Sequence, residues 1–130
     1  YVKDLNGRNS LYIYAVCNYE YDSHVNYIFK KSESGPSAGL MIALSLYDKT
    51  TIEDLSKGRV IAGTGTIDID GNIGEISGIK YKLMGVKDVD IFFVPYDNYE
   101  EAKQIVKEYN YDINLVPVNT FNDAINYLKK

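Results

Sequence analysis

The segment Ile91–Val94 is an unbroken apolar run that ends at Pro95, and it predicts a strand. Apolar residues recur at helical spacing on both sides of it, in residues 79–86 before the strand and in residues 102–109 after it. A further strand is expected at Ile113–Val118. This order of strands and helices favours an α+β or α/β sandwich built as one domain.

Polar residues mark where the later helices begin. Asp97 and Glu100 have the spacing of a capping box before the helix of residues 102–109. Thr120 and Asp123 have the same relation before a last helix that carries Phe121, Ala124, Ile125 and Leu128. We therefore expect both helices to start at side-chain caps.

The first half of the chain mixes hairpin and helix signals. Two paired strands are expected at Leu11–Tyr19 and Val25–Phe29, and a buried helix is expected to begin at Pro36 and continue through Tyr47. The remaining predictions are a helical turn at Thr51–Lys57, a strand at Val60–Ile69 and a hairpin turn at Asp70–Asn72. Together these elements fit a single domain over residues 1–130.

Composition excludes several classes of function. The 130 residues carry a net charge of -4, which leaves no basic surface for nucleic acid. The longest apolar run, Ala38–Leu46, is far shorter than the roughly 20 residues of a membrane span, so no membrane contact by this domain is expected. One cysteine, Cys17, and one histidine, His24, exclude a disulfide framework and a zinc site of several Cys and His ligands. We expect neither a metal nor a cofactor.

Ser37 lies among small residues at the start of the helix that begins at Pro36. Its hydroxyl can be approached closely there, and backbone N–H groups of the first turn can face a developing oxyanion. The alternative interpretation is that Ser37 is only a capping serine, and the pentapeptide Gly35–Gly39 does not decide between them. A catalytic serine needs a base.

Two kinds of base are available to Ser37. A triad with His24 and Asp22 is one, although no motif supports it. The other is a lysine that burial keeps neutral, and Lys80 and Lys82 are the candidates. Residues two apart on a helix point about 200° from each other, so only one of them faces a buried site. We expect Lys80 to face it, and the alternative is that both lysines are solvated charges.

Four fragments in order resemble the proteolytic domain of Lon-type serine proteases. They are Gly35-Pro36-Ser37-Ala38-Gly39, Ala62-Gly63-Thr64-Gly65-Thr66, Gly71-Asn72-Ile73-Gly74 and Gly78-Ile79-Lys80-Tyr81-Lys82. The interval from Ser37 to Lys80 and the strand that ends at Pro95 fit the same pattern. The resemblance covers nearly the whole chain.

The resemblance implies a serine endopeptidase with a Ser-Lys dyad. Ser37 is then the nucleophile and Lys80 the general base, and Thr64 is expected to hydrogen-bond near the lysine amine. Gly35, Pro36 and Ala38 are expected to support the serine. Two positions depart from the family pattern: Ser34 stands where an acidic residue is common, and Ser77 stands where a glycine is usual.

The amino-acid sequences of several segments most resemble those of PDZ-containing, membrane-anchored Lon-like proteases of Gram-positive bacteria. These segments are Gly39–Met41, Ala62–Asp68 and Pro117–Phe121. That likeness implies a longer parent protein with an N-terminal anchor and a PDZ module, on the extracytoplasmic face of the cell membrane. The implied partners are a peptide or protein substrate and further copies of the chain in a homo-oligomer.

Other interpretations of the same residues lead to different functions. The residues contain no Gly-x-x-x-x-Gly-Lys-Ser/Thr loop, so we expect limited, ATP-independent cleavage. A catalytically silent peptide-binding or assembly domain is the main alternative, with Ser37 as a cap and Lys80 as an ordinary charge. Phosphate binding at the helix start is another alternative, although no Mg²⁺-binding carboxylate motif accompanies it.

Overall fold

The computed structural model describes residues 35–86 and 88–130. The predicted strands Leu11–Tyr19 and Val25–Phe29 lie outside the described residues, as do Cys17 and His24. In chain order the elements are η1 (Pro36–Ala38), α1 (Gly39–Thr50), β1 (Ile61–Gly63), β2 (Thr66–Ile67), β3 (Ile73–Gly74), α2 (Ile79–Met84), β4 (Ile91–Pro95), η2 (Tyr96–Asn98), α3 (Tyr99–Glu108), β5 (Leu115–Val118) and α4 (Phe121–Lys129). The single domain over residues 1–130 stays a prediction.

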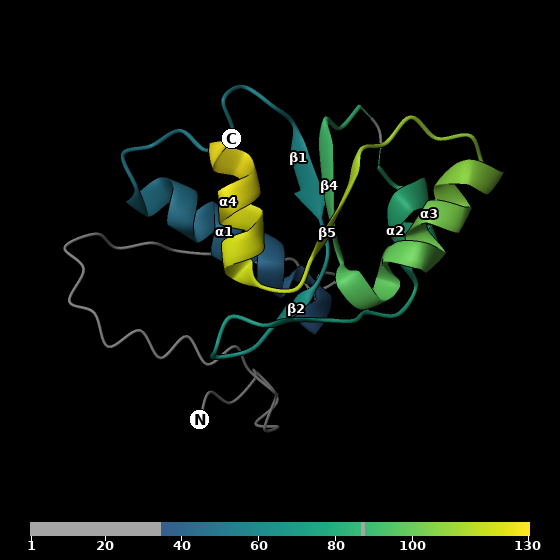
Figure 1. Ribbon diagram of the computed structural model, residues 1–130, viewed down its shortest axis with the longest axis horizontal. Coiled ribbons are helices and arrows are strands. Elements are labelled where there is room, and N and C mark those ends of the chain that lie inside the picture. Colours follow the sequence, from purple (N-terminus) through teal and green to yellow (C-terminus); the bar gives the residue numbers. More distant parts are fainter. Residues whose placement is uncertain (1–34, 87) are drawn as a thin grey trace, which may run out of the picture. The chain divides into compact units, whose positions relative to one another are not determined.

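Three parallel strands form a sheet in the order β1-β4-β5. Helices α1 and α4 lie on one side of this sheet, and α2 and α3 lie on the other (Figure 1). Parallel neighbours need crossover connections, and here α2 lies between β1 and β4 and α3 lies between β4 and β5. The described residues thus confirm the predicted α/β sandwich.

Strand β4 supplies both apolar layers of the sandwich. All of Ile91–Pro95 is buried, and successive side chains point to opposite faces of the sheet. Ile91 and Phe93 pack in the cluster with α1 and α4, whereas Phe92 and Val94 pack in the cluster with α2 and α3. An unbroken apolar sequence is therefore required at this position, because both faces of the strand are covered.

A short antiparallel ribbon, β2 with β3, follows β1 and turns at the predicted hairpin. Gly71 adopts a φ of 84°, which favours glycine, and Asn72 donates to Asp68 through its backbone and its side chain. The Asn72 side-chain bond is the main reason that the pKa of Asp68 lies below its ordinary value. Ile73 donates to the carbonyl of Asn119 at 2.8 Å, so the ribbon is tied to the end of β5.

Three predicted features differ in the structure. No helix forms at Thr51–Lys57, where Asp54 instead accepts turn hydrogen bonds from Ser56 and Lys57. The strand expected at Val60–Ile69 is broken between β1 and β2, because the chain turns there toward Ser37. The prediction of a capping box at Asp97 and Glu100 is wrong, because Asn98 is the N-cap of α3 and its side chain makes no capping hydrogen bond.

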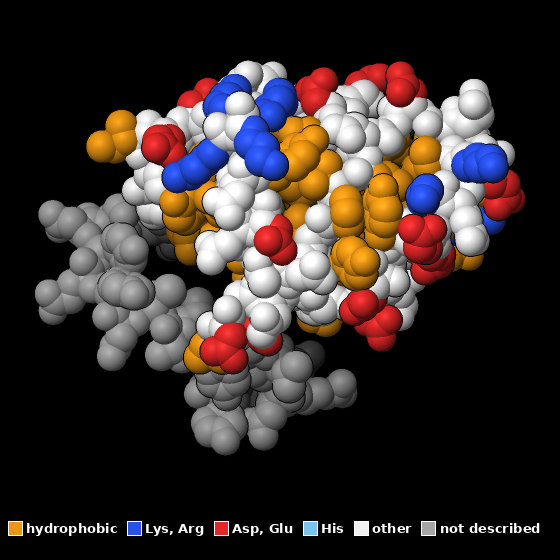
Figure 2. All heavy atoms as spheres, viewed as in Figure 1, with side chains coloured by type: hydrophobic (Ala, Val, Ile, Leu, Met, Phe, Trp, Pro, Cys, Tyr) orange, Lys and Arg blue, Asp and Glu red, His pale blue; other side chains and the backbone are white. Residues whose placement is uncertain are grey.

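Basic side chains gather near the C-terminal end of α4 (Figure 2). Arg59 donates from Nη2 to the carbonyl of Leu128 at 2.9 Å, and Lys57 donates from Nζ to the carbonyl of Lys129 at 3.1 Å. These bonds satisfy carbonyl groups that the helix end leaves unpaired, and the positive charges oppose the negative end of the helix dipole. Among the described residues, no helix has the length and apolarity needed to cross a bilayer.

The predicted capping box of α4 is confirmed. The backbone N–H of Asp123 donates to Thr120 Oγ1 at 3.2 Å, and the Asp123 carboxylate accepts from the backbone N–H of Thr120 at 2.8 Å. Burial pushes the pKa of Asp123 upward, but the hydrogen bonds from the backbone N–H groups of Thr120 and Asn119 outweigh it and hold the pKa below its ordinary value.

The change Asp123→Ala removes this cap and should lower the free energy of unfolding by about 1 kcal/mol near neutral pH. Since the folded state lowers the pKa of Asp123, its contribution is present above the ordinary carboxyl range and is lost as the pH falls through the lowered pKa. Urea titrations of both proteins against pH should therefore converge in acid. Asp112→Ala, at an exposed position outside the helices and strands, is the matched control. An equal loss at all pH values would contradict the prediction.

Candidate active site

Ser37 lies in η1, the tight turn that leads directly into α1. Pro36 occupies the first position of this turn, where its missing N–H costs nothing and its fixed φ suits a helix start. Gly35 precedes the turn with an extended backbone, and Gly35, Pro36 and Ala38 are exposed while Ser37 is half-buried. The sequence therefore presents a serine on a rigid helix start surrounded by small or compact residues.

The backbone of Ser37 is held by the segment between β1 and β2. Its carbonyl accepts from the backbone N–H of Gly65 at 2.8 Å and from the Thr64 hydroxyl at 2.9 Å. Gly65 returns a bond, because its carbonyl accepts from the N–H of Leu40 at 3.1 Å. Thr64 is 1% exposed, so its hydroxyl needs this partner. These bonds fix the position of Ser37 relative to β1.

Two glycines allow this close approach of backbones. A Cβ atom on Gly39 would lie 2.9 Å from Ile67 Cγ2, and one on Gly65 would lie 2.7 Å from Ile73 Cγ2. Gly65 also has a φ of 156°, at the edge of the region that side chains rarely adopt. A larger residue at Gly39 would push α1 away from β2, and one at Gly65 would push the β1–β2 connection away from β3.

Lys82 is the lysine that meets Ser37. It extends from α2, and its Nζ lies 3.0 Å from Ser37 Oγ in a hydrogen bond between two partly buried side chains. Helix α2 is held in place by Ile79 and Leu83, which are fully buried against α3 and β4. The site thus brings together two side chains that are 45 positions apart.

The expectation that Lys80 lies within hydrogen-bond reach of Ser37 is wrong. Its Nζ lies over the ring of Tyr109, 4.8 Å from the centroid, on the side of α2 that faces α3. Hydrogen bonding to Tyr109 is the main cause that raises the pKa of Lys80 above its ordinary value, so the expected lowering by burial is also wrong. Met84, four residues after Lys80 on α2, is 48% exposed.

Helical periodicity could not distinguish the two lysines. A helix turns about 100° per residue, so Lys80 and Lys82 lie about 80° to either side of the buried direction that Ile79 and Leu83 define. Both flanks are equivalent on the helix itself. The two lysines differ only in the neighbours of α2. Lys80 lies on the flank that faces α3, and Lys82 lies on the flank that faces Ser37.

The other predicted site residues stand as follows. Thr64 contacts the dyad region through the carbonyl of Ser37 and not through a lysine amine, which corrects its expected partner. Asp22 and His24 lie outside the described residues, so the triad alternative is untested. Within residues 35–86 and 88–130, no group of three His, Cys, Asp or Glu side chains could hold a metal ion.

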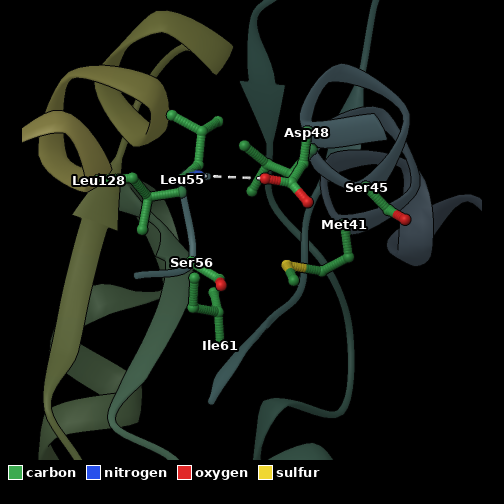
Figure 3. Close-up of a pocket in the computed structure, with 8 residues that line it drawn as sticks. Met41, Ser45, Asp48, Leu55, Ser56, Ile61 and Leu128 are labelled. Carbon is green, nitrogen blue, oxygen red and sulfur yellow. Dashed lines mark hydrogen bonds between the residues drawn. The ribbon is translucent and has the colours of Figure 1, made fainter. Parts of the chain in front are cut away.

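A separate hollow lies between α1, the segment that follows it and α4 (Figure 3). Its volume is about 180 Å³, and aliphatic side chains such as Leu44, Ile61 and Leu128 make up much of its wall. The Asp48 carboxylate in this wall accepts a bond from the N–H of Leu55 at 3.2 Å. Neither Ser37 nor Lys82 lines it, so this hollow is distinct from the candidate active site.

A serine hydroxyl and a lysine amine are thus in direct contact on an α/β sandwich, an arrangement suited to nucleophilic catalysis. Residues 24–129 match the family described as the Lon protease (S16) C-terminal proteolytic domain, and the chain belongs to this family.

Named relatives agree with the family assignment. The chain is 34% identical over 94 residues to the Lon protease of Aster yellows witches'-broom phytoplasma (strain AYWB), covering 71% of this chain and 12% of the relative. It is 33% identical over 98 residues to the Lon protease of Campylobacter jejuni, covering 73% and 12%. It is 27% identical over 108 residues to Lon protease 2 of Bacillus subtilis (strain 168), covering 82% and 18%. The chain therefore spans only a small part of these relatives.

The change Thr64→Val tests the anchor of Ser37. It keeps a similar shape but removes the donor to the Ser37 carbonyl, so we expect a loss of about 1 kcal/mol in the free energy of unfolding by urea titration. Thr64→Ser keeps the hydroxyl and serves as the control. If Thr64→Val is as stable as the parent protein, the hydroxyl does not carry the stabilisation.

Proposed function

We propose that this chain is the catalytic domain of a serine endopeptidase in which Ser37 is the nucleophile and Lys82 is the general base. The observation that carries the proposal is the 3.0 Å contact between Lys82 Nζ and Ser37 Oγ. A base must lie within about 2.6–3.2 Å of the proton that it removes, and this contact meets that requirement. The role first assigned to Lys80 passes to Lys82.

The reaction begins when the neutral Lys82 amine accepts the proton of the Ser37 hydroxyl and Oγ attacks the peptide carbonyl. The resulting Lys82 ammonium then donates that proton to the leaving amine as the peptide C–N bond breaks, which leaves an acyl-enzyme. Water next attacks the acyl carbonyl and loses a proton to Lys82. The proton then returns to Ser37 Oγ as the ester bond breaks and the acid product leaves.

Backbone groups near Ser37 fit the charge that develops on the substrate. The first two N–H groups of α1 donate to backbone carbonyls, so the donors proposed for the oxyanion are the N–H groups of Ser37 and Ala38 in η1. Donors held there stabilise a tetrahedral oxyanion without having to reorganise. The bonds from Thr64 and Gly65 to the Ser37 carbonyl keep this turn rigid during the reaction.

The finer parts of the proposal concern the parent protein. Limited, ATP-independent cleavage fits residues that contain no Walker-type loop. The wording of Ala62–Asp68 supports a PDZ-containing, membrane-anchored parent, with this domain on the extracytoplasmic face and its copies in a homo-oligomer. Sequencing the gene on both sides of this segment tests the parentage, since an ATPase module next to the domain would contradict it.

The two lysines of α2 provide a matched pair of variants. Lys82→Met should lower kcat/KM on peptide substrates by at least about a thousandfold, because it removes the only amine that contacts Ser37 among the described residues. Lys80→Met should retain activity within about threefold, since Lys80 contacts Tyr109 instead. Cleavage is followed by mass spectrometry, with Ser37→Ala as the inactive reference. Equal losses in both lysine variants would overturn the assignment.

The histidine alternative is tested separately. A Ser-Lys dyad needs no imidazole, so His24→Ala should keep most of the peptidase activity. Circular dichroism checks that the variant is folded. A loss in His24→Ala comparable to that in Lys82→Met would favour the triad with Asp22.

A parent chain that cleaves nothing and whose Ser37 resists serine-directed reagents would favour the binding or assembly domain.

A further inference from the structure

Asn98 is a buried polar residue that the reaction scheme above does not use. It is 5% exposed, and its side chain makes two bonds to one residue of a different segment. The N–H of Ile76 donates to Asn98 Oδ1 at 2.8 Å, and Asn98 Nδ2 donates to the carbonyl of Ile76 at 3.0 Å. The amide thus pairs with both backbone polar groups of Ile76, as a neighbouring strand would.

Ile76 lies on the short connection between β3 and α2, the helix that carries Lys82. Gly78 ends this connection with a φ of 73°, and α2 itself has only 6 residues. A helix this short has little stability of its own, so its position depends on its surroundings. Ile79 and Leu83 fix the rotation of α2 through burial, and the Ile76 backbone fixes where the helix begins.

Strand β4, which precedes Asn98, is also connected to Ser37. Asn98 ends the turn η2 that follows β4 directly. Within β4, the carbonyl of Phe93 accepts from the N–H of Thr64 at 3.0 Å, and Thr64 in turn donates to the carbonyl of Ser37. Strand β4 is therefore connected to Ser37 through Thr64, and to the segment before Lys82 through Asn98.

We propose that Asn98 is a positioning residue for catalysis, which sets the approach of Lys82 to Ser37 by clamping the backbone of Ile76. This inference rests on the proposed roles of Ser37 and Lys82. It also explains why the side chain of Asn98 does not cap α3, although Asn98 stands at its N-cap. A capping side chain would accept from the first N–H groups of α3, but Asn98 Oδ1 accepts from the N–H of Ile76 instead.

The change Asn98→Leu tests the proposal, because leucine is similar in size and makes neither bond. We expect kcat on a peptide substrate, per folded molecule, to fall by about tenfold to about a hundredfold, while KM changes less than about twofold. Asn114→Leu is the matched control, since among the described residues the Asn114 amide bonds only the Tyr127 hydroxyl, at 3.2 Å. The control should keep kcat within about twofold of the parent.

Asn98→Asp provides a conservative variant with a readout that depends on pH. Its carboxyl group accepts from the N–H of Ile76 in either form, but only the protonated form donates to the Ile76 carbonyl. The ratio of kcat in this variant to kcat in the parent should therefore rise as the pH falls. A ratio that does not change with pH, at constant folded fraction, would count against the clamp.

Crystal structures of the parent and of Asn98→Leu give a readout that does not need activity. We expect the distance from Lys82 Nζ to Ser37 Oγ to lengthen beyond hydrogen-bond reach in the variant. An unchanged distance together with an unchanged kcat would overturn the role of Asn98. Activity that survives in Ser37→Ala would instead overturn the proposed function, and the distance comparison would still decide whether Asn98 positions the lysine.

Discussion

Strand β4 is the constraint on which the described structure depends. Its backbone pairs with β1 on one edge and β5 on the other, and its alternating side chains fill both apolar layers. Its carbonyl at Phe93 holds the segment that anchors Ser37, and the turn after it supplies Asn98 to the segment before Lys82. Burial on both faces makes β4 rigid. The segment that anchors Ser37 and the segment that precedes Lys82 are therefore both attached to the same rigid strand.

Helix α1 and the β1–β2 connection lie closer to the β2–β3 ribbon than ordinary side chains permit. Glycine at positions 39 and 65 removes the Cβ atoms that would collide with Ile67 and Ile73. The hydrogen bonds of Thr64 and Gly65 to the Ser37 carbonyl then replace backbone solvation lost in this approach. The position of Ser37 therefore depends on the β1–β2 connection as much as on α1.

Local patterns predicted the elements whose cause is local. The capping box of Thr120 and Asp123 forms as expected because both partners belong to one helix start. The box of Asp97 and Glu100 does not form, because η2 shifts the helix start to Asn98. The segment Val60–Ile69 has strand-forming residues, but bonds from Thr64 and Gly65 to a distant serine divide it into two strands. In the strand a contact from far along the chain outweighed the local preference, whereas in the capping box a competing local turn did so.

The sequence by itself identified Ser37 as the candidate nucleophile, with two lysines of one helix or His24 as candidate bases. It placed Ser37 at a helix start among small residues, and the structure has Ser37 in η1 just before α1. The tertiary structure decided which of Lys80 and Lys82 contacts Ser37. The two residues flank the buried face of α2 symmetrically, so no property of the helix distinguishes them. The packing of α3 places Tyr109 against one flank, and the anchoring of α1 to β1 brings Ser37 to the other.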